Sequence, residues 1–209
     1  TASVLNLLLL DKTTKKNIIW ATDTYEEYGE GFYDNNEINA KFLLYHKDIV
    51  MPRIEKTLEA QSDRTRKKAE VFTPVWLCNR MNNHLDEDWF ERRGVFNSEN
   101  DDSTWTVIQE PVKFQDNKTW QNYVDLKKLE ITCGEAPYLV SRYDAATGKS
   151  IELMERIGLL DRKLRIVNEN TKDYDDWVKW CIRAYESVYG YEYQGDNLLI
   201  ARINLFLTF

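Results

Sequence analysis

The 209-residue sequence predicts an α/β fold, and three segments carry the prediction. Residues 129–133 form a short apolar strand that runs into a tight turn at Gly134. Residues 171–186 are the clearest helix, because apolar side chains recur at every fourth position. Residues 188–193 alternate aromatic side chains in the manner of a strand. Strands that alternate with helices favour a layered α/β domain.

The remaining elements are expected around this frame. We predict an N-terminal lobe over residues 1–63, with apolar strands at 3–10 and 17–21 and a polar loop at 25–36. Thr73 is a candidate N-cap, with Pro74 at the first helical position of an amphipathic helix.

Residues 86–128 lack sustained periodicity and are expected to form an insertion. The sequence predicts a polar loop at 97–104 within it, and a hairpin-like pair at 105–108 and 112–114. A helix is expected to start near Pro137, and a last helix is expected over 197–207 with Asp196 as its cap.

Composition narrows the chemistry. Hydrophobic residues make up 43% of the chain and charged residues 30%, which is typical of a folded globular protein. The longest apolar run, Leu7–Leu10, is far shorter than the roughly 20 residues that cross a bilayer. Three widely spaced cysteines without a Cys-x-x-Cys pair indicate reduced thiols in a cytoplasmic protein.

The common catalytic and phosphate-binding motifs are absent from the sequence. It holds no GxSxG, HExxH, GxGxxG or GxxxxGK[ST] segment, and its two histidines cannot supply a zinc site of ordinary spacing. The 28 basic and 35 acidic residues give a net charge of −7, which does not favour broad nonspecific binding to DNA. A local basic stretch is present at Arg64, Arg66, Lys67 and Lys68, and it is either a solvated helix end or a phosphate-facing patch.

Three segments in order resemble the S-adenosylmethionine-binding half of adenine-N6 DNA methyltransferases from restriction–modification systems. Glu70-Val-Phe-Thr-Pro-Val-Trp-Leu-Cys-Asn-Arg-Met81 is similar to the N-terminal Thr-Pro motif of that family. Leu129-Glu-Ile-Thr-Cys-Gly-Glu-Ala-Pro-Tyr-Leu139 resembles its first-strand cofactor loop, Leu-Glu-Pro-Ala-Cys-Gly-x-Gly-x-Phe-Leu. The segment 188–205 looks like the second strand with its terminal acid, followed by an Asp-Asn-x-x-x-Ala-Arg helix.

The resemblance covers residues 64–209 and implies a partial doubly wound, Rossmann-like sheet in which strands 129–133 and 188–193 are parallel neighbours. It implies S-adenosylmethionine as the cofactor, DNA as a partner and a possible restriction–modification partner subunit. The residues that it places at the cofactor are Thr73, Glu130, Thr132, Cys133, Gly134 and Glu192.

Chemistry supports part of this set independently. A carboxylate at the end of a strand can accept hydrogen bonds from two ribose hydroxyls, and Glu192 is expected to be that carboxylate. The plainer alternatives are a solvent-side strand residue at Glu192, an ordinary turn at Gly134 and a simple cap at Thr73. Cys133 has nothing nearby that would lower its pKa, so a packing role is expected.

Two departures from the family pattern matter. Ala136 stands where the cofactor loop has its second glycine, so a methyl group could crowd the cofactor. The catalytic Asn/Asp-Pro-Pro-Tyr/Phe motif, which holds the flipped adenine, is absent because no two prolines are adjacent. The chain is therefore expected to be a fragment or a reduced relative, with no catalytic residue of its own.

Two other classes of function remain open. The acidic surface would suit a noncatalytic interaction module or a DNA mimic. A magnesium-dependent nuclease would need Asp with Asp/Glu-x-Lys, and the sequence holds three Asp-x-Lys pairs: Asp116/Lys118, Asp125/Lys127 and Asp161/Lys163.

Overall fold

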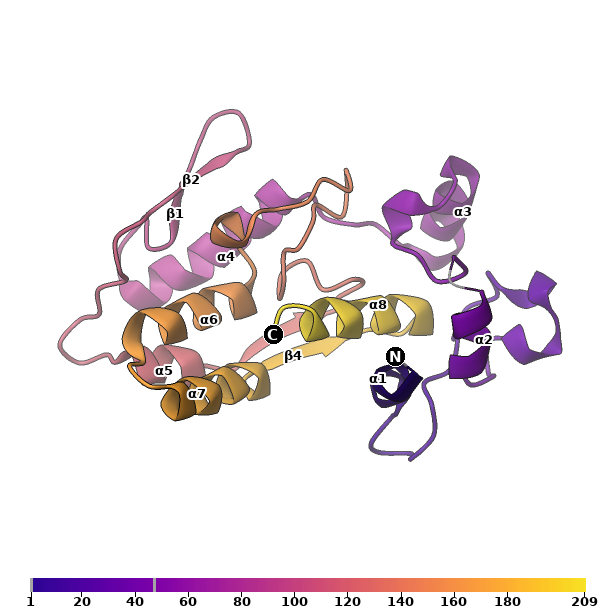
Figure 1. The fold of residues 1–209 in the computed structure, drawn as a ribbon. Helices are drawn as coiled ribbons and strands as arrows, with labels where there is room; N and C mark the ends of the chain where they lie inside the picture. Colours follow the sequence, from indigo (N-terminus) through magenta and orange to yellow (C-terminus); the bar gives the residue numbers. More distant parts are fainter. Residues whose placement is uncertain (1, 47) are drawn as a thin grey trace. The chain divides into compact units, whose positions relative to one another are not determined.

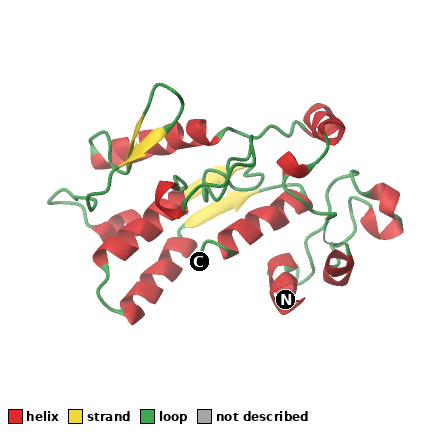
Figure 2. Ribbon diagram, turned by 45° about the horizontal axis from the view of Figure 1, so that its top comes forward, coloured by secondary structure: helices red, strands yellow, loops and turns green. Residues whose placement is uncertain are grey.

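The structure is a computed structural model that describes residues 2–46 and 48–209. It is a mixed α/β structure, mostly helical, with two small two-stranded sheets (Figures 1 and 2). The helices are α1 (Ala2–Leu9), α2 (Ala40–Tyr45), α3 (Leu58–Lys68), α4 (Val75–Phe90), α5 (Trp120–Asp125), α6 (Leu159–Asn170), α7 (Tyr174–Glu186) and α8 (Gly195–Phe206). The strands are β1 (Asn97–Glu99), β2 (Trp105–Val107), β3 (Lys128–Ile131) and β4 (Val188–Tyr191). Short 3₁₀ turns lie at Glu26–Tyr28, Glu30–Phe32, Arg53–Glu55 and Leu153–Glu155.

The chain forms two compact units. The first unit contains residues 1–71, 132–135 and 191–207. The second contains residues 72–131, 136–190 and 208–209. Helix α3 runs across residue 64, the position where the resemblance begins, so the helix is continuous through that boundary.

The first unit is built on an N-terminal helix where a strand is expected from the sequence. Residues 2–9 form α1, because leucine is a strong helix former and the run holds a single β-branched residue, Val4. Arg202 on α8 donates to the carbonyl of Leu8 at 2.6 Å, which satisfies a free acceptor at the end of α1. The core of this unit is formed by Leu9, Ile18, Trp20, Tyr25, Phe32, Ile38, Ala40, Leu43, Ile49 and Leu199.

The second predicted strand of this unit, residues 17–21, is extended but forms no ladder. Its pairing consists of isolated bridges, Leu10 with Asn17 and Ile19 with Glu37. The segment is held instead by its side chains: Trp20 is fully buried and packs near Tyr25, with 4.6 Å between ring centroids. The apolar residues at 17–21 therefore reflect core packing, and not a sheet.

The second unit packs α5, α6 and α7 around an aromatic core. Phe90 and Tyr123 lie 5.3 Å apart between ring centroids, and both are buried. Helix α7 matches the predicted helix, although it begins at Tyr174 after an Asp173 N-cap that accepts from the backbone N–H of Asp176.

A hairpin is present in the predicted insertion, but at a different place. Strands β1 and β2 pair antiparallel, so the expected loop at 97–104 contains a strand and the pairing with 112–114 does not occur. Asp102 accepts hydrogen bonds from the backbone N–H and the hydroxyl of Thr104, and Ser103 has a positive φ of 64°. These turn contacts reverse the chain within the polar stretch.

Strands β3 and β4 form the other sheet, and they are parallel as predicted. The N–H of Lys128 donates to the carbonyl of Ser187, and the N–H of Cys133 donates to the carbonyl of Tyr191. The residue numbers rise together along both segments, as they do in a parallel pair. The α/β class is thus confirmed. The expected partial doubly wound sheet is reduced, among the described residues, to this one parallel pair.

Two further expectations about helix starts are wrong. Residues 136–140 form one turn and no helix; the N–H groups of Leu139 and Val140 both return to the carbonyl of Ala136. Ala136 itself has a φ of 66°, which a helix cannot contain. The last helix, α8, begins two residues early with Gln194 as its N-cap, so Asp196 lies inside the first turn.

Among the described residues, none of the helices combines the length and the apolar character needed to cross a bilayer. Cys78, Cys133 and Cys181 are buried, and they form no disulfide with one another. Burial raises the pKa of the Cys78 thiol to about 12 and that of Cys181 to about 11, so neither is a reactive thiolate near neutral pH.

Candidate functional site

The carboxyl ends of β3 and β4 bring the predicted loop and the predicted acid together. Glu192 follows the last residue of β4, and Gly134 lies in the turn after β3. The N–H of Gly134 donates to one oxygen of the Glu192 carboxylate at 2.7 Å, and the N–H of Gln194 donates to the other at 2.9 Å. The carboxylate is half-buried and oriented by backbone groups from both strand ends.

The turn after β3 has an unusual backbone. Thr132 and Gly134 both have a φ of 54°, and Ala136 has a φ of 66°. Two of these three are not glycine, and the left-handed region costs an L-residue about 1–2 kcal/mol. A strained backbone of this kind persists only where the surrounding contacts hold it in place, and such positions cluster at ligand-binding sites. Ala136 is completely buried, so its methyl group packs inside the protein.

Thr73 and Glu130 lie in the second unit, where Tyr138 connects them. The Glu130 carboxylate is buried and accepts from the backbone N–H groups of Leu139 at 3.2 Å and Tyr138 at 3.5 Å. Burial raises the pKa of the Tyr138 hydroxyl, while a hydrogen bond with Thr73 opposes that shift.

The N-cap expected at Thr73 is wrong by one residue. Pro74 is the N-cap of α4, and its carbonyl accepts from the N–H groups of Leu77 and Cys78. The proline has an extended ψ of 145°, so the helix starts after it. The Thr73 side chain is therefore not used as a cap.

The six predicted cofactor residues thus fall into two groups. Thr132, Cys133, Gly134 and Glu192 belong to the first unit, whereas Thr73 and Glu130 belong to the second. Cys133 is buried, consistent with its expected packing role, and Thr132 is exposed.

The basic stretch at the end of α3 does not act as one patch. Arg64 is buried, and its guanidinium donates to Glu70 at 2.5 Å and to Asp196 at 3.2 Å. The expected phosphate contact by Arg64 is therefore corrected, because its charge is already paired inside the first unit. Lys68 pairs with Asp23 at 3.1 Å, while Arg66 and Lys67 are exposed.

Asp196, paired with Arg64, is a buried acid that sequence reasoning took for a helix cap. Burial opposes its ionisation, but the charges of Lys56 and Arg64 lower its pKa below the ordinary value. Lys56 lies 3.1 Å from the carboxylate, and the Tyr25 hydroxyl donates to it at 2.7 Å. The residue holds α8 to the rest of the first unit.

A second buried polar network was missed entirely. Arg162 on α6 donates to Asp86 at 2.6 Å, to Asn83 at 2.7 Å and to Asn79 at 2.9 Å, all three on α4. The sequence does indicate this network, because the polar residues at 79, 82, 83 and 86 repeat at helical spacing and therefore share one face of the helix. This face is buried and polar, the reverse of the usual pattern.

The Asp-x-Lys pairs have other partners. Lys163 is completely buried and donates to the carbonyls of Val124 and Leu126 and to the Ser187 hydroxyl. Asp161 accepts instead from the N–H groups of Ser141 and Gly158. Asp125 pairs with Arg183, and Lys118 with Glu91, so these contacts give a nuclease no support.

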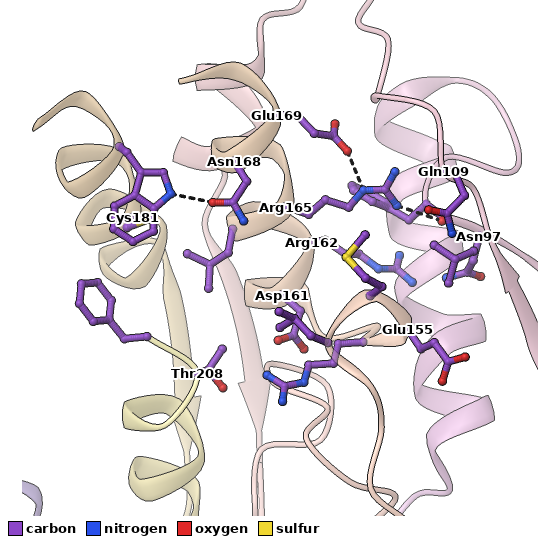
Figure 3. A pocket seen from close by; sticks show the side chains of 18 residues that line it. Asn97, Gln109, Glu155, Asp161, Arg162, Arg165, Asn168, Glu169, Cys181 and Thr208 are labelled. Atoms are coloured by element: carbon purple, nitrogen blue, oxygen red, sulfur yellow. Dashed lines mark hydrogen bonds and ion pairs between the residues drawn. The ribbon is translucent and has the colours of Figure 1, made fainter. Parts of the chain in front are cut away.

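The second unit also contains a cavity of about 400 Å³, shown in Figure 3. Helix α6 supplies Asp161, Arg162, Arg165, Asn168 and Glu169, and the facing helix α7 supplies Cys181. The remaining walls come from the hairpin, the segment 153–156 and residues 208–209. Its lining combines apolar and aromatic side chains with polar and charged ones.

A scan against protein-family models, a search of curated proteins and a search of solved structures found no match to this chain.

Proposed function

We propose that this chain is the S-adenosylmethionine-binding part of an adenine-N6 DNA methyltransferase of a restriction–modification system, and that it does not methylate DNA alone. One observation carries the proposal: the Gly134 turn and Glu192 are joined by a 2.7 Å hydrogen bond at the carboxyl ends of parallel strands. In open α/β sheets, ligands bind at the carboxyl ends of the strands.

The Glu192 carboxylate fits a ribose. Each of its oxygens accepts one backbone N–H, from Gly134 or from Gln194. A carboxylate has about four acceptor positions, so one remains on each oxygen for a hydroxyl group. The two backbone donors also hold the carboxylate in one orientation, which lowers the entropic cost of binding.

Bound S-adenosylmethionine would supply an electrophilic methyl group, and the residues of this chain would bind and orient it. Glu192 would accept hydrogen bonds from the ribose. The backbone groups of the strained turn at Thr132, Cys133 and Gly134 would contact the cofactor directly. DNA is the proposed partner, with Arg66, Lys67 and Lys68 as the cations left near the surface of α3.

The test is calorimetry with S-adenosylhomocysteine. We expect binding, and we expect Glu192→Ala to weaken it by about 1.5–3 kcal/mol, the range for hydrogen bonds to a charged group. Glu152→Ala, at an exposed glutamate of the second unit, is the control and should leave binding unchanged.

Two results would contradict the proposal. An unchanged affinity of Glu192→Ala would remove the ribose assignment. No binding at all, combined with tight binding to a protein partner, would favour the noncatalytic interaction module. Because Glu192 also holds the Gly134 turn, the unfolding midpoint of each variant is measured in parallel.

A further inference from the structure

We propose that the cavity of the second unit binds a small aromatic carboxylate, with Arg156 as its anion-binding residue. The cavity has a volume of about 400 Å³, within the range of about 300–1,000 Å³ for small-molecule sites. The proposal is independent of the proposed function, because none of the predicted cofactor residues lines this cavity.

Three arginines line the cavity, and two of them are already used. Arg162 is bonded to Asp86, Asn79 and Asn83. Arg165 donates to the carbonyls of Phe96, Ile108 and Glu110 and to the carboxylate of Glu169, a pair marked in Figure 3. These two arginines therefore hold the walls of the cavity.

Arg156 differs from both. It is half-buried, and its guanidinium makes no hydrogen bond or close ion pair with any residue that the structure describes. Its Nε is fully buried without an acceptor. A guanidinium that has lost much of its water and has no internal acceptor favours an anion from outside, and its planar fork matches a carboxylate.

The acidic residues of the cavity make no hydrogen bond to Arg156, so the hydrogen-bonding edge of its guanidinium stays available. The Asp161 carboxylate is within electrostatic range of Arg156, but it accepts from the backbone N–H groups of Ser141 and Gly158. Glu169 is held by Arg165 at 2.7 Å. Glu155 is exposed to solvent, where water screens its charge.

The rest of the lining favours a ligand whose carboxylate is attached to an aromatic ring. Trp177 is fixed in the wall, because its indole N–H donates to Asn168 at 2.6 Å, the bond drawn in Figure 3. Aromatic pairs gain about 0.5–1.5 kcal/mol beyond area burial. The other apolar lining side chains are Phe96, Val107, Leu153, Met154, Leu164 and Phe209.

The experiment compares three probes by calorimetry on the intact chain: 2-naphthoate, the neutral 2-naphthamide and acetate. We expect 2-naphthoate to bind at least about tenfold more tightly than either the amide or acetate, since a bond to a charged group is worth about that factor. The indole N–H resonance of Trp177, assigned with Trp177→Phe, should shift on binding.

Arg156→Gln should reduce 2-naphthoate affinity by about tenfold or more and leave 2-naphthamide unaffected. This variant should fold, because Arg156 makes no hydrogen bond to a described residue. Arg93→Gln, at an arginine whose side chain is 93% exposed, is the matched control and should bind as the parent does. Equal binding of acid and amide, unchanged affinity in Arg156→Gln, an unshifted Trp177 signal or no binding of any probe would each overturn the proposal.

Discussion

At the scale of single residues, buried charges are the most consequential feature of this chain. Arg64, Glu70 and Asp196 form ion pairs in the first unit, with side chains that are almost fully buried. A buried pair is costly to form, but removing one partner is costlier, because the other charge is left without compensation. The loss of unfolding free energy in substitutions at these positions therefore tests whether the charges are buried.

We predict that Arg64→Ala lowers the free energy of unfolding by about 3 kcal/mol, the lower end of the range for a broken buried pair, since Glu70 and Asp196 lose their shared cation and keep only the cations Arg53 and Lys56. Arg66→Ala is the matched control on the same helix, because Arg66 is exposed, and it should change stability by less than about 0.5 kcal/mol. Urea unfolding curves measure both. Equal effects would mean that the Arg64 side chain is not buried.

Lys163 gives a prediction about pH. Burial, reinforced by the charge of Lys128, lowers the pKa of its ammonium group to about 7. The unfolded value is about 10.4, so between pH 7 and 10 the unfolded chain binds more protons at this residue than the folded chain. Lys163 should therefore make the free energy of unfolding increase as the pH rises, by at most about 1.4 kcal/mol per pH unit.

The measurement is the stability difference between the parent and Lys163→Met at about pH 7, 7.75 and 8.5, inside the window between the two pKa values. We expect the variant to lose part of the rise with pH. Lys172→Met, at an exposed lysine, should retain it. A parent and a Lys163→Met curve that run parallel would show that Lys163 does not titrate in this window.

At the scale of elements, the start of α8 depends on one glycine. A Cβ added at Gly195 would lie 1.8 Å from the carbonyl oxygen of Ile19, and the Gly195 N–H donates to the carbonyl of Trp20 at 2.8 Å. The backbone of α8 therefore approaches the segment 17–21 more closely than any side chain permits.

Gly195→Ala is expected to destabilise the first unit by about 1–3 kcal/mol, the cost of overpacking, or more. Gly31→Ala is its control, because a Cβ there meets nothing within 4 Å. Thermal unfolding followed by circular dichroism compares the two. A Gly195→Ala variant as stable as Gly31→Ala would contradict the close approach.

Local sequence patterns predict some of the helices and strands correctly and others wrongly. Helix α7 and the positions of strands β3 and β4 follow from side-chain spacing, because each carries its own periodicity. The parallel direction of the two strands was implied by the resemblance and not by the spacing. The strand expected at 3–10 is a helix, since an apolar run without alternation suits either element. The helix expected after Pro137 stops after one turn, because the N–H of Ser141 donates to the Asp161 carboxylate and not to the carbonyl of Pro137.

At the scale of the whole molecule, the prediction concerns activity. Methyl transfer to adenine requires the flipped base to be held in line with the methyl donor, and positioning of this kind reaches effective molarities of roughly 10⁵–10⁸ M. The sequence contains no adjacent prolines and no Asn-Pro or Asp-Pro pair to supply the missing motif. We therefore expect no methylation of DNA by this chain alone.

An assay with tritiated S-adenosylmethionine and mixed-sequence duplex DNA measures this directly. Binding to DNA without transfer should be weak and should fall with added salt, since only a few cations of α3 remain exposed. Robust incorporation of tritium by the purified chain would show that it holds a catalytic site that does not depend on the Asn/Asp-Pro-Pro-Tyr/Phe motif.

The sequence by itself determined the local features of this protein: the helical period of α7, the turn at Gly134 and the acid that follows β4. Each depends on residues close together along the chain, where spacing and turn chemistry act. Only the tertiary structure decided which polar residues are buried and with whom. Arg162 and Asp86 are 76 positions apart, and Arg64 and Asp196 are 132 apart. Pairing over such separations is set by packing of the whole fold, because a charge is retained in a core only where a partner from another element meets it.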